Sequence, residues 1–146
     1  MAIKFLSKIK KWKDFSNLAP YPIKLDGTLW KSSEHYYQFK KFEKTDPQFA
    51  QKIKNAPTPK DAKKLSMKNN NVPANWNDVK VKVLKVAVRK KFESYPQLKK
   101  LLLSTGNEEL IEANPDDYFW GEGEDGSGKN IMGQILMEIR EHLANK

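Results

Sequence analysis

The sequence predicts an α+β fold that is mostly α-helical, in a single domain over residues 1–146. The chain has 146 residues, a usual length for one domain, and 38% of them are hydrophobic, so burial can drive folding. Apolar residues recur at helical spacing along most of the chain. The pattern of two strands joined by a tight turn is clear only near residues 22–30.

The first expected element is a small β-hairpin near residues 22–30. Strand-type residues flank Asp26-Gly27, a dipeptide that accepts the positive φ angles of a tight two-residue turn. Ser32 and Ser33 follow, and a serine at such a position can cap a helix, here one that runs to about Lys44. We therefore expect a hairpin that leads directly into a helix.

Three more helices are predicted in the middle of the chain. Asp46-Pro47 and Thr58-Pro59 each place a capping residue before a first-turn proline, which is typical of a helix start. Helical spacing also predicts a longer helix from Asn75 to Glu93. Its expected core stripe consists of Trp76, Val79, Val83, Val86, Ala87 and Phe92.

The last third of the chain alternates between helices and irregular segments. Tyr95-Pro96 ends the long helix, and leucines at 98 and 101–103 predict another helix before Gly106. Residues 108–113 predict a short strand. Residues 107–128 contain eight acidic residues and no Lys or Arg, and they become glycine-rich, which predicts a loop before a helix over residues 129–143.

The composition excludes several kinds of chemistry. The sequence contains no cysteine, which excludes disulfides, thiolate metal sites and a cysteine nucleophile. The longest apolar run, Leu101 to Leu103, is too short to span a bilayer, and residues 1–13 lack the apolar region and cleavage site of a signal peptide. We therefore expect a cytoplasmic protein with no membrane partner.

The charge is distributed unevenly along the chain. Residues 1–73 contain 16 lysines and 6 acidic residues, a net charge of +10, whereas residues 74–146 contain 11 basic and 12 acidic residues, a net charge of −1. The total is the stated +9. A basic surface attracts nucleotides, nucleic acids or anionic membranes, although ordinary solubility explains a lysine-rich surface equally simply.

One predicted helix carries residues suited to chemistry. Four polar side chains share one side of it: Glu34, Tyr37, Gln38 and Lys41. Three residues share the opposite, apolar side: His35, Phe39 and Phe42. A carboxylate beside an amine can divide proton transfer and nucleophilic attack. A solvated amphipathic face predicts the same spacing, and periodicity alone favours that plainer alternative. On the apolar side, we expect His35 to be a hydrogen-bonded structural residue.

A glycine-rich segment precedes the last predicted helix. Glycines allow backbone amides to approach a ligand, and a helix N-terminus with a nearby lysine suits a phosphate. The segment over residues 120–130 is therefore a candidate phosphate cradle, and a flexible surface turn is the alternative. Its spacing matches neither a Walker A motif nor a dinucleotide-binding motif.

Taken in order, four motifs resemble the NADAR family, also called YbiA-like. The motifs are Asp14-Phe15-Ser16-Asn17-Leu18, Ser33-Glu34-His35-Tyr36-Tyr37-Gln38 with Lys41-Phe42, Asn75-Trp76, and Trp120-Gly121 with residues 126–130. The resemblance extends from about Phe5 to Leu143. Two positions depart from the family's pattern, since Phe119 stands where a tyrosine is common and Glu122 where an aspartate is usual.

The resemblance implies a mostly helical α+β domain that hydrolyses N-glycosidic bonds, with no metal and no organic cofactor. Known members act on phosphoribosylamino-pyrimidine intermediates of riboflavin synthesis or on ADP-ribose attached to guanine in nucleic acid. The basic surface favours ADP-ribosylated guanine in DNA or RNA as the substrate. A non-catalytic nucleotide or nucleic-acid binding module is a further alternative. An ADP-ribosyltransferase toxin encoded in the same operon would be a fitting partner.

The resemblance also implies roles for individual residues. Glu34 corresponds to the catalytic carboxylate, Lys41 to a lysine that could trap the sugar as a Schiff base, and Asp117 is the candidate second acid. The substrate-binding candidates are Phe15, Ser16, Asn17, Tyr37, Gln38, Trp76, Trp120, Gly121, Gly128, Lys129 and Asn130.

Overall fold

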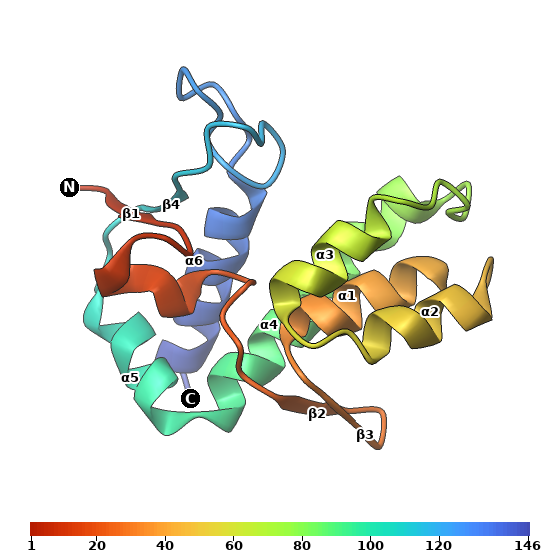
Figure 1. Ribbon diagram of the computed structural model, residues 1–146. Helices are drawn as coiled ribbons and strands as arrows, with labels where there is room; N and C mark the ends of the chain where they lie inside the picture. Colours follow the sequence, from red (N-terminus) through yellow and green to blue (C-terminus); the bar gives the residue numbers. More distant parts are fainter. The chain divides into compact units, whose positions relative to one another are not determined.

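The computed structural model describes residues 1–146 and confirms the mostly helical α+β class (Figure 1). The chain forms two compact units. One is the continuous stretch Asn17–Ser94, and the other joins Met1–Ser16 to Tyr95–Lys146. None of the helices combines the length and the apolar character needed to cross a bilayer.

The unit Asn17–Ser94 begins with the predicted hairpin. Strands β2 (Ile23–Leu25) and β3 (Thr28–Trp30) pair antiparallel, with Ile23 opposite Trp30. The turn between them has φ of 54° at Asp26 and 75° at Gly27, which is the positive-φ geometry that this dipeptide favours. The hairpin prediction is confirmed.

Helix α1 (Ser33–Phe42) follows β3 and is capped as expected. The side chain of Ser32 accepts a hydrogen bond from the backbone N–H of His35. Every residue from Ser32 to Gln38 is buried, because α1 packs against α2, α3 and α4. The alternative of a solvated amphipathic face is therefore wrong, since the polar side of the helix is enclosed as well as the aromatic side.

Helices α2 (Pro47–Lys54) and α3 (Pro59–Ser66) start where the proline pairs predicted. Asp46 and Thr58 each accept a hydrogen bond from the backbone N–H three residues later. The two helices complete an apolar cluster with the end of α1. Its buried members are Phe42, Ala50, Ile53, Ala56 and Ala62.

Helix α4 (Trp76–Ser94) is present as predicted, but its buried stripe differs. Val86 is 44% exposed, and Val79 and Val83 are only partly buried. The buried positions are Trp76, Leu84, Ala87, Val88, Lys91 and Phe92. They follow the i, i+3, i+4, i+7 pattern of a helix that faces a core. The prediction failed at Val86 because valines occur on several sides of this helix.

The second unit contains α5 (Pro96–Ser104) and α6 (Ile131–Ala144), and α6 packs against both α5 and β4 (Leu110–Glu112). The sequence predicted all three elements. It did not predict β1 (Ile3–Phe5), which pairs parallel to β4, or the 3₁₀ helix η1 (Lys10–Phe15).

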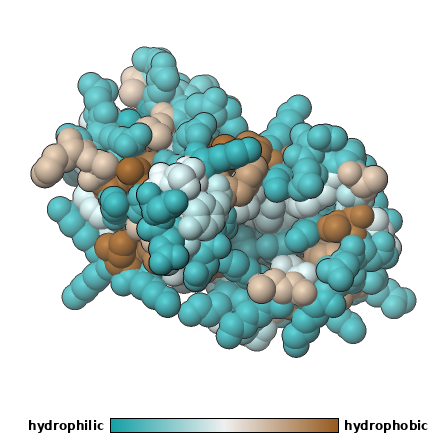
Figure 2. Space-filling model, turned by 90° about the horizontal axis from the view of Figure 1, so that it is seen from above, coloured by the Kyte–Doolittle hydropathy of each residue, from teal (hydrophilic) through white to brown (hydrophobic).

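The surface agrees with the mean hydropathy of −0.77. Figure 2 shows mostly hydrophilic residues on the face it presents, with apolar residues in small separate groups. The exposed large apolar side chains include Leu29, Met67, Val86 and Tyr118, which belong to four different segments of the chain.

Candidate functional site

The candidate site is centred on Glu34, in the first turn of α1. Its side chain is only 6% exposed. Asn17 Nδ2 donates a hydrogen bond to Glu34 Oε1 over 2.6 Å, and Gln38 Nε2 donates to Oε2 over 2.9 Å. Both carboxylate oxygens therefore accept a hydrogen bond from an amide, one of which comes from outside the helix.

A second layer of contacts holds the Asn17 amide in place. The hydroxyl of Ser33 donates to Asn17 Oδ1, which leaves the NH2 group of Asn17 to face Glu34. Ser33 is itself fully buried in the first turn of α1. The orientation of the carboxylate is thus set by a chain of side chains that begins at the helix N-terminus.

Burial raises the pKa of the Glu34 carboxyl, because desolvation disfavours its charged form. Several neighbours oppose this shift and favour the carboxylate. They are, in decreasing order of effect, the hydrogen bond from Gln38, the charge of Lys63, the hydrogen bond from Asn17 and the charge of Lys41. A carboxyl with a raised pKa is suited to exchange a proton with a substrate or with water.

Lys41 lies two turns after Glu34 on the same helix and is half-buried. Burial lowers the pKa of its ammonium group, the charge of Glu34 opposes this, and the charge of Lys80 lowers the pKa further. A lysine that is desolvated and next to another cation is more readily deprotonated, which is the condition for a nucleophilic amine.

Tyr37 and Trp76 form the aromatic part of the site in this unit. Their ring centroids lie 5.3 Å apart, at an interplanar angle of 52°. Both residues are almost fully buried, at 7% exposure each. The pair connects α1 to the start of α4.

His35 is the structural residue that the sequence predicted. Its Nε2 lies 2.9 Å from the carbonyl oxygen of Ala56, and its Nδ1 lies 2.6 Å from Ser32 Oγ. The carbonyl can only accept, so Nε2 carries the proton and Nδ1 accepts from the serine hydroxyl. Burial lowers the pKa of His35, which favours this neutral form.

The other predicted site residues belong to the unit that joins Met1–Ser16 to Tyr95–Lys146. Asp117 Oδ1 accepts hydrogen bonds from the backbone N–H groups of Phe119 and Trp120, over 3.0 and 2.8 Å. One carboxylate oxygen of Asp117 is thus used to shape its loop. The ring of Trp120 packs edge-on against Phe119, with centroids 4.8 Å apart.

The glycine-rich segment is not an open amide cradle, and that interpretation is wrong. Its successive amides are already bonded to the preceding segment. The bonds run from the N–H groups of Gly128, Lys129, Asn130, Ile131 and Met132 to the carbonyls of Glu122, Tyr118, Gly121, Phe119 and Trp120, respectively. These amides therefore hold the two sides of the loop together, and the exposed part of the loop is confined to residues 124–127 and Lys129.

Two residues of this loop have roles in packing. A Cβ atom at Gly128 would collide with the backbone of Gly121 and Glu122, so only glycine fits there. The side chain of Asn130 accepts from the N–H of Glu112 and donates to the carbonyl of Leu110, both over 2.9 Å. The Asn130 amide thereby ties the start of α6 to β4. Lys129 is exposed, and its Nζ lies 5.8 Å from the centre of the Phe119 ring.

Phe15 packs among other aromatic side chains. It is fully buried, stacks on Trp12 at 5.4 Å between ring centroids and packs edge-on against Phe5 at 6.0 Å. Its ring belongs to the core in this structure, and a contact of Phe15 with substrate stays a prediction. Ser16 is 5% exposed.

Three residues near Glu34 were not predicted. They are Ser33, which orients Asn17, and Lys63 and Lys80, which act on the charges of Glu34 and Lys41. Ser33 belongs to a motif of the resemblance, but the only role predicted for it was that of a helix cap. Lys63 on α3 and Lys80 on α4 look like ordinary surface lysines in the sequence, so only the packing of α1 against those helices shows their relevance.

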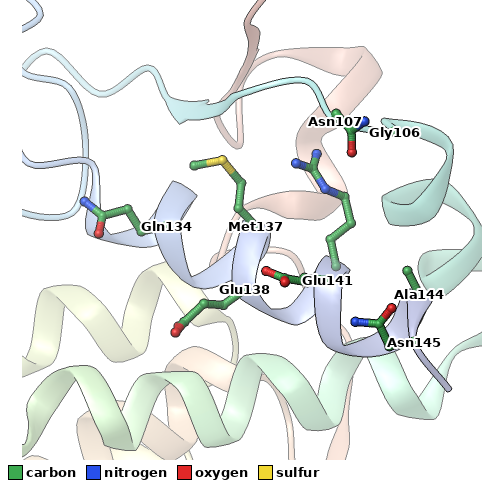
Figure 3. Close-up of a pocket in the computed structure, with 9 residues that line it drawn as sticks. Gly106, Asn107, Gln134, Met137, Glu138, Glu141, Ala144 and Asn145 are labelled. Atoms are coloured by element: carbon green, nitrogen blue, oxygen red, sulfur yellow. The ribbon is translucent and has the colours of Figure 1, made fainter.

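A pocket of about 570 Å³ lies along α6 and the turn after α5 (Figure 3). It is lined by Gly106, Asn107, Gln134, Met137, Glu138, Arg140, Glu141, Ala144 and Asn145. Arg140 is fixed by hydrogen bonds to Thr105 Oγ1 and to the carbonyl of Glu108, over 2.9 and 2.8 Å. No predicted site residue lines this pocket.

Comparison with known proteins gives one matching domain model and several full-length relatives. The model of the NADAR domain matches residues 3–144. The N-glycosidase YbiA of Shigella boydii serotype 4 (strain Sb227) is 42% identical over 144 residues, which cover 97% of this chain and 88% of that protein. The riboflavin biosynthesis protein VVA0006 of Vibrio vulnificus (strain YJ016) is 41% identical over 129 residues, 88% of this chain but only 35% of that longer protein.

A solved structure with the same fold is the NMR structure of the Escherichia coli protein YbiA. It superimposes with a TM-score of 0.89 at 40% sequence identity. The alignment covers 99% of this chain and 85% of that chain. The similarity therefore extends over the whole chain and over the elements that hold Glu34.

Proposed function

Since this chain belongs to the NADAR family and is a hydrolase of N-glycosyl compounds, we propose that it removes ADP-ribose from ADP-ribosylated guanine in nucleic acid. The observation that supports catalysis at α1 is the buried Glu34 carboxylate, held by two amides, with the half-buried Lys41 two turns away. Desolvation of a buried charge is costly, so a buried ionisable carboxyl on this helix face supports a role in function.

Glu34 is suited to act as the general base. In direct hydrolysis, the carboxylate takes a proton from water while the water oxygen attacks C1 of the ribose. The C1–N bond then breaks, and its electron pair stays on the guanine nitrogen, which takes up a proton. Asp117 is our candidate for the acid that supplies this proton. The amides of Asn17 and Gln38 hold the Glu34 carboxylate in one orientation while it takes the proton.

Lys41 offers a second route through a covalent intermediate. Its neutral amine attacks C1, the guanine leaves with the bonding electrons, and opening of the ribose ring gives a Schiff base that water hydrolyses. This route needs a deprotonated lysine. Burial lowers the pKa of Lys41, the charge of Glu34 raises it and the charge of Lys80 lowers it, and the net shift makes the amine easier to deprotonate.

The distribution of charge supports a nucleic-acid substrate. The unit Asn17–Ser94 contains 17 basic and 7 acidic residues, a net charge of +10, whereas the other unit contains 10 basic and 11 acidic residues, a net charge of −1. All of the net positive charge therefore belongs to the unit that contains Glu34. Phosphates of a strand that carries the modified guanine would be attracted there.

The alternative substrate is a phosphoribosylamino-pyrimidine of riboflavin synthesis. The name of the Vibrio vulnificus relative favours it, although that relative is much longer than this chain. The reaction would use the same groups, since it also breaks a bond between ribose C1 and an amine nitrogen.

A direct assay distinguishes the two substrates. The protein is incubated with ADP-ribosylated single-stranded DNA and, separately, with the riboflavin intermediate, and the release of ADP-ribose or ribose phosphate is followed. We expect turnover of the modified DNA and its loss in Glu34→Gln. Glu43→Gln is the matched control, because Glu43 follows α1 and pairs only with Lys40. Binding without product by the folded wild-type protein would contradict the hydrolase assignment for these substrates.

Reduction by borohydride tests the Schiff-base route. We expect it to attach the sugar covalently to the wild-type protein and not to Lys41→Ala. Lys40→Ala is the control, since the adjacent Lys40 lies over the ring of Tyr36, 5.4 Å from its centre. A protein that turns over substrate without any trapped adduct would favour direct attack by water.

A further inference from the structure

The side-chain amide of Gln38 has one end in use and the other without a partner. Its Nε2 donates to Glu34 Oε2, whereas its Oε1 is buried and accepts no hydrogen bond. The residue is 6% exposed. Buried polar atoms in proteins are almost always hydrogen-bonded. An acceptor without a donor, on the residue that holds the candidate catalytic carboxylate, therefore needs an explanation.

The orientation of this amide follows from the chemistry of its neighbour. An ionised carboxylate can only accept hydrogen bonds, so the NH2 group of Gln38 must face Glu34 and the carbonyl oxygen must point elsewhere. If the amide were rotated by 180°, Gln38 Oε1 would face Glu34 Oε2, and two hydrogen-bond acceptors would lie against each other. The free acceptor is thus a consequence of the contact that holds Glu34.

Asn17 provides the comparison within the same site. It also donates its amide to Glu34, over 2.6 Å, but its own carbonyl oxygen accepts from the hydroxyl of Ser33. The two amides therefore perform the same task for Glu34 and differ in one respect. The carbonyl of Asn17 is satisfied within the protein, and the carbonyl of Gln38 is not.

We propose that Gln38 Oε1 accepts a hydrogen bond from a hydroxyl group of the ribose whose C1 is attacked. This rests on the N-glycoside hydrolase function proposed above. The site lacks a donor, and a sugar hydroxyl brings one, whereas the oxygens of an ionised phosphate accept.

The position of Gln38 suits this contact. It lies one helical turn from Glu34, so a hydroxyl bound to Oε1 is held beside the carboxylate. Hydrogen bonds to the hydroxyl next to the anomeric carbon strengthen as the sugar approaches an oxocarbenium-like transition state. Gln38 would then position both the Glu34 carboxylate and the reacting sugar.

The test is a double-mutant cycle in which the Gln38 amide and a ribose hydroxyl are removed separately and together. Wild-type protein and Gln38→Met are assayed for kcat/KM with modified DNA whose reacting ribose is intact, 2-deoxy or 3-deoxy, and for the Kd of ADP-ribose and the same deoxy analogues. In the wild type, we expect loss of one hydroxyl to reduce kcat/KM about tenfold or more. In Gln38→Met, we expect loss of that hydroxyl to have little further effect.

Asn17→Leu is the matched control. It removes the other amide on Glu34, so it should lower the rate, but its effect should multiply with that of the missing hydroxyl. A residue that only holds Glu34 would behave in the same way as Asn17. Multiplicative losses in Gln38→Met would therefore overturn the proposed hydrogen bond while the hydrolase function stands.

The deoxy substrates also test the proposal without any change to the protein. If the wild type turns over both deoxy substrates as fast as the intact one, no hydroxyl reaches Gln38 and the proposal fails. If the wild type turns over no substrate at all, the proposed function fails, and the Kd cycle decides the hydrogen bond. Equal Kd values for ADP-ribose and both analogues, or no binding, would overturn it.

Discussion

At the scale of single residues, the site depends on how a carboxyl can be kept inside the protein. Glu34 has two amide donors and two lysine charges around it, and even so burial raises its pKa. The neighbours therefore reduce the cost of the charge without removing it. Residues placed for function commonly lower stability in this way.

We expect the stability of Glu34→Gln relative to the wild type to increase as pH rises, because only the wild type has a carboxyl that must be ionised in the protein interior. Because the folded-state pKa of Glu34 is raised, the native state binds more protons than the unfolded state at pH values between the two pKa values. The wild type thus loses stability as pH rises from about 4.3 through the folded-state pKa, whereas the amide does not titrate.

Urea unfolding of both proteins over a range of pH measures this difference. At acidic pH the variant should be no more stable than the wild type, because its new NH2 group faces the NH2 group of Asn17 or Gln38. Its stability relative to the wild type should then increase with pH until Glu34 is fully ionised. If the free energies of unfolding of the two proteins change with pH in parallel, ionisation of Glu34 costs the folded state no stability.

Lys63 offers a second prediction at this scale. Its charge lowers the pKa of Glu34, so Lys63→Ala should raise that pKa and move the acidic limb of the pH profile of kcat/KM to higher pH. Lys60→Ala is the control, because Lys60 is exposed and one turn earlier on α3. If the acidic limb of the kcat/KM profile lies at the same pH in Lys63→Ala and Lys60→Ala, Lys63 has no electrostatic effect on Glu34.

At the scale of elements, the helices around α1 determine what its side chains can do. α2, α3 and α4 all pack against it, which removes solvent from both its aromatic and its polar side. On α4, Ala87 belongs to a buried cluster with Tyr36 of α1, and the other buried positions of this helix include Val88 and Phe92. The support of the site therefore depends on which side of α4 is buried.

Two valines of α4 test that assignment. Val88 is fully buried and Val86 is 44% exposed, although they are only two residues apart. We expect Val88→Ala to lower the free energy of unfolding by roughly 1.5–3 kcal/mol, since two buried methyl groups are lost. Val86→Ala should change it by less than about 0.5 kcal/mol. Similar urea midpoints for the two variants would contradict the observed stripe.

At the scale of the whole molecule, the main feature is the separation of charge between the two units. The net charge of +10 in Asn17–Ser94 is long-range and depends on no single contact. Such a field acts mostly on charged partners that extend beyond the site, and salt screens it. A DNA strand would respond to it more strongly than a small metabolite would.

We expect the KM for ADP-ribosylated single-stranded DNA to rise steeply between about 50 and 200 mM salt, and the KM for an ADP-ribosylated mononucleoside to rise much less. The double variant Lys60→Glu with Lys64→Glu should raise the KM for DNA selectively. Lys8→Glu with Lys100→Glu, two exposed lysines of the other unit, is the control. Equal effects of both pairs would argue against a nucleic-acid surface on the unit Asn17–Ser94.

The sequence by itself determined the local structure and the position of Glu34 on a helix. The Asp26-Gly27 turn, the caps at Ser32, Asp46 and Thr58, and the side of α1 shared by Glu34 and Gln38 all follow from interactions within a few residues. The family resemblance made Glu34 the leading candidate, although periodicity alone favoured a solvated face.

Only the tertiary structure decided whether that helix face is enclosed and what surrounds the carboxylate. The contact of Asn17 with Glu34 spans 17 residues, Lys63 reaches the site from another helix, and β1 pairs with a strand more than 100 residues away. Such neighbours depend on how helices and strands pack, and packing leaves no fixed spacing in the sequence. For the same reason, the free carbonyl of Gln38 became visible only when its surroundings were known.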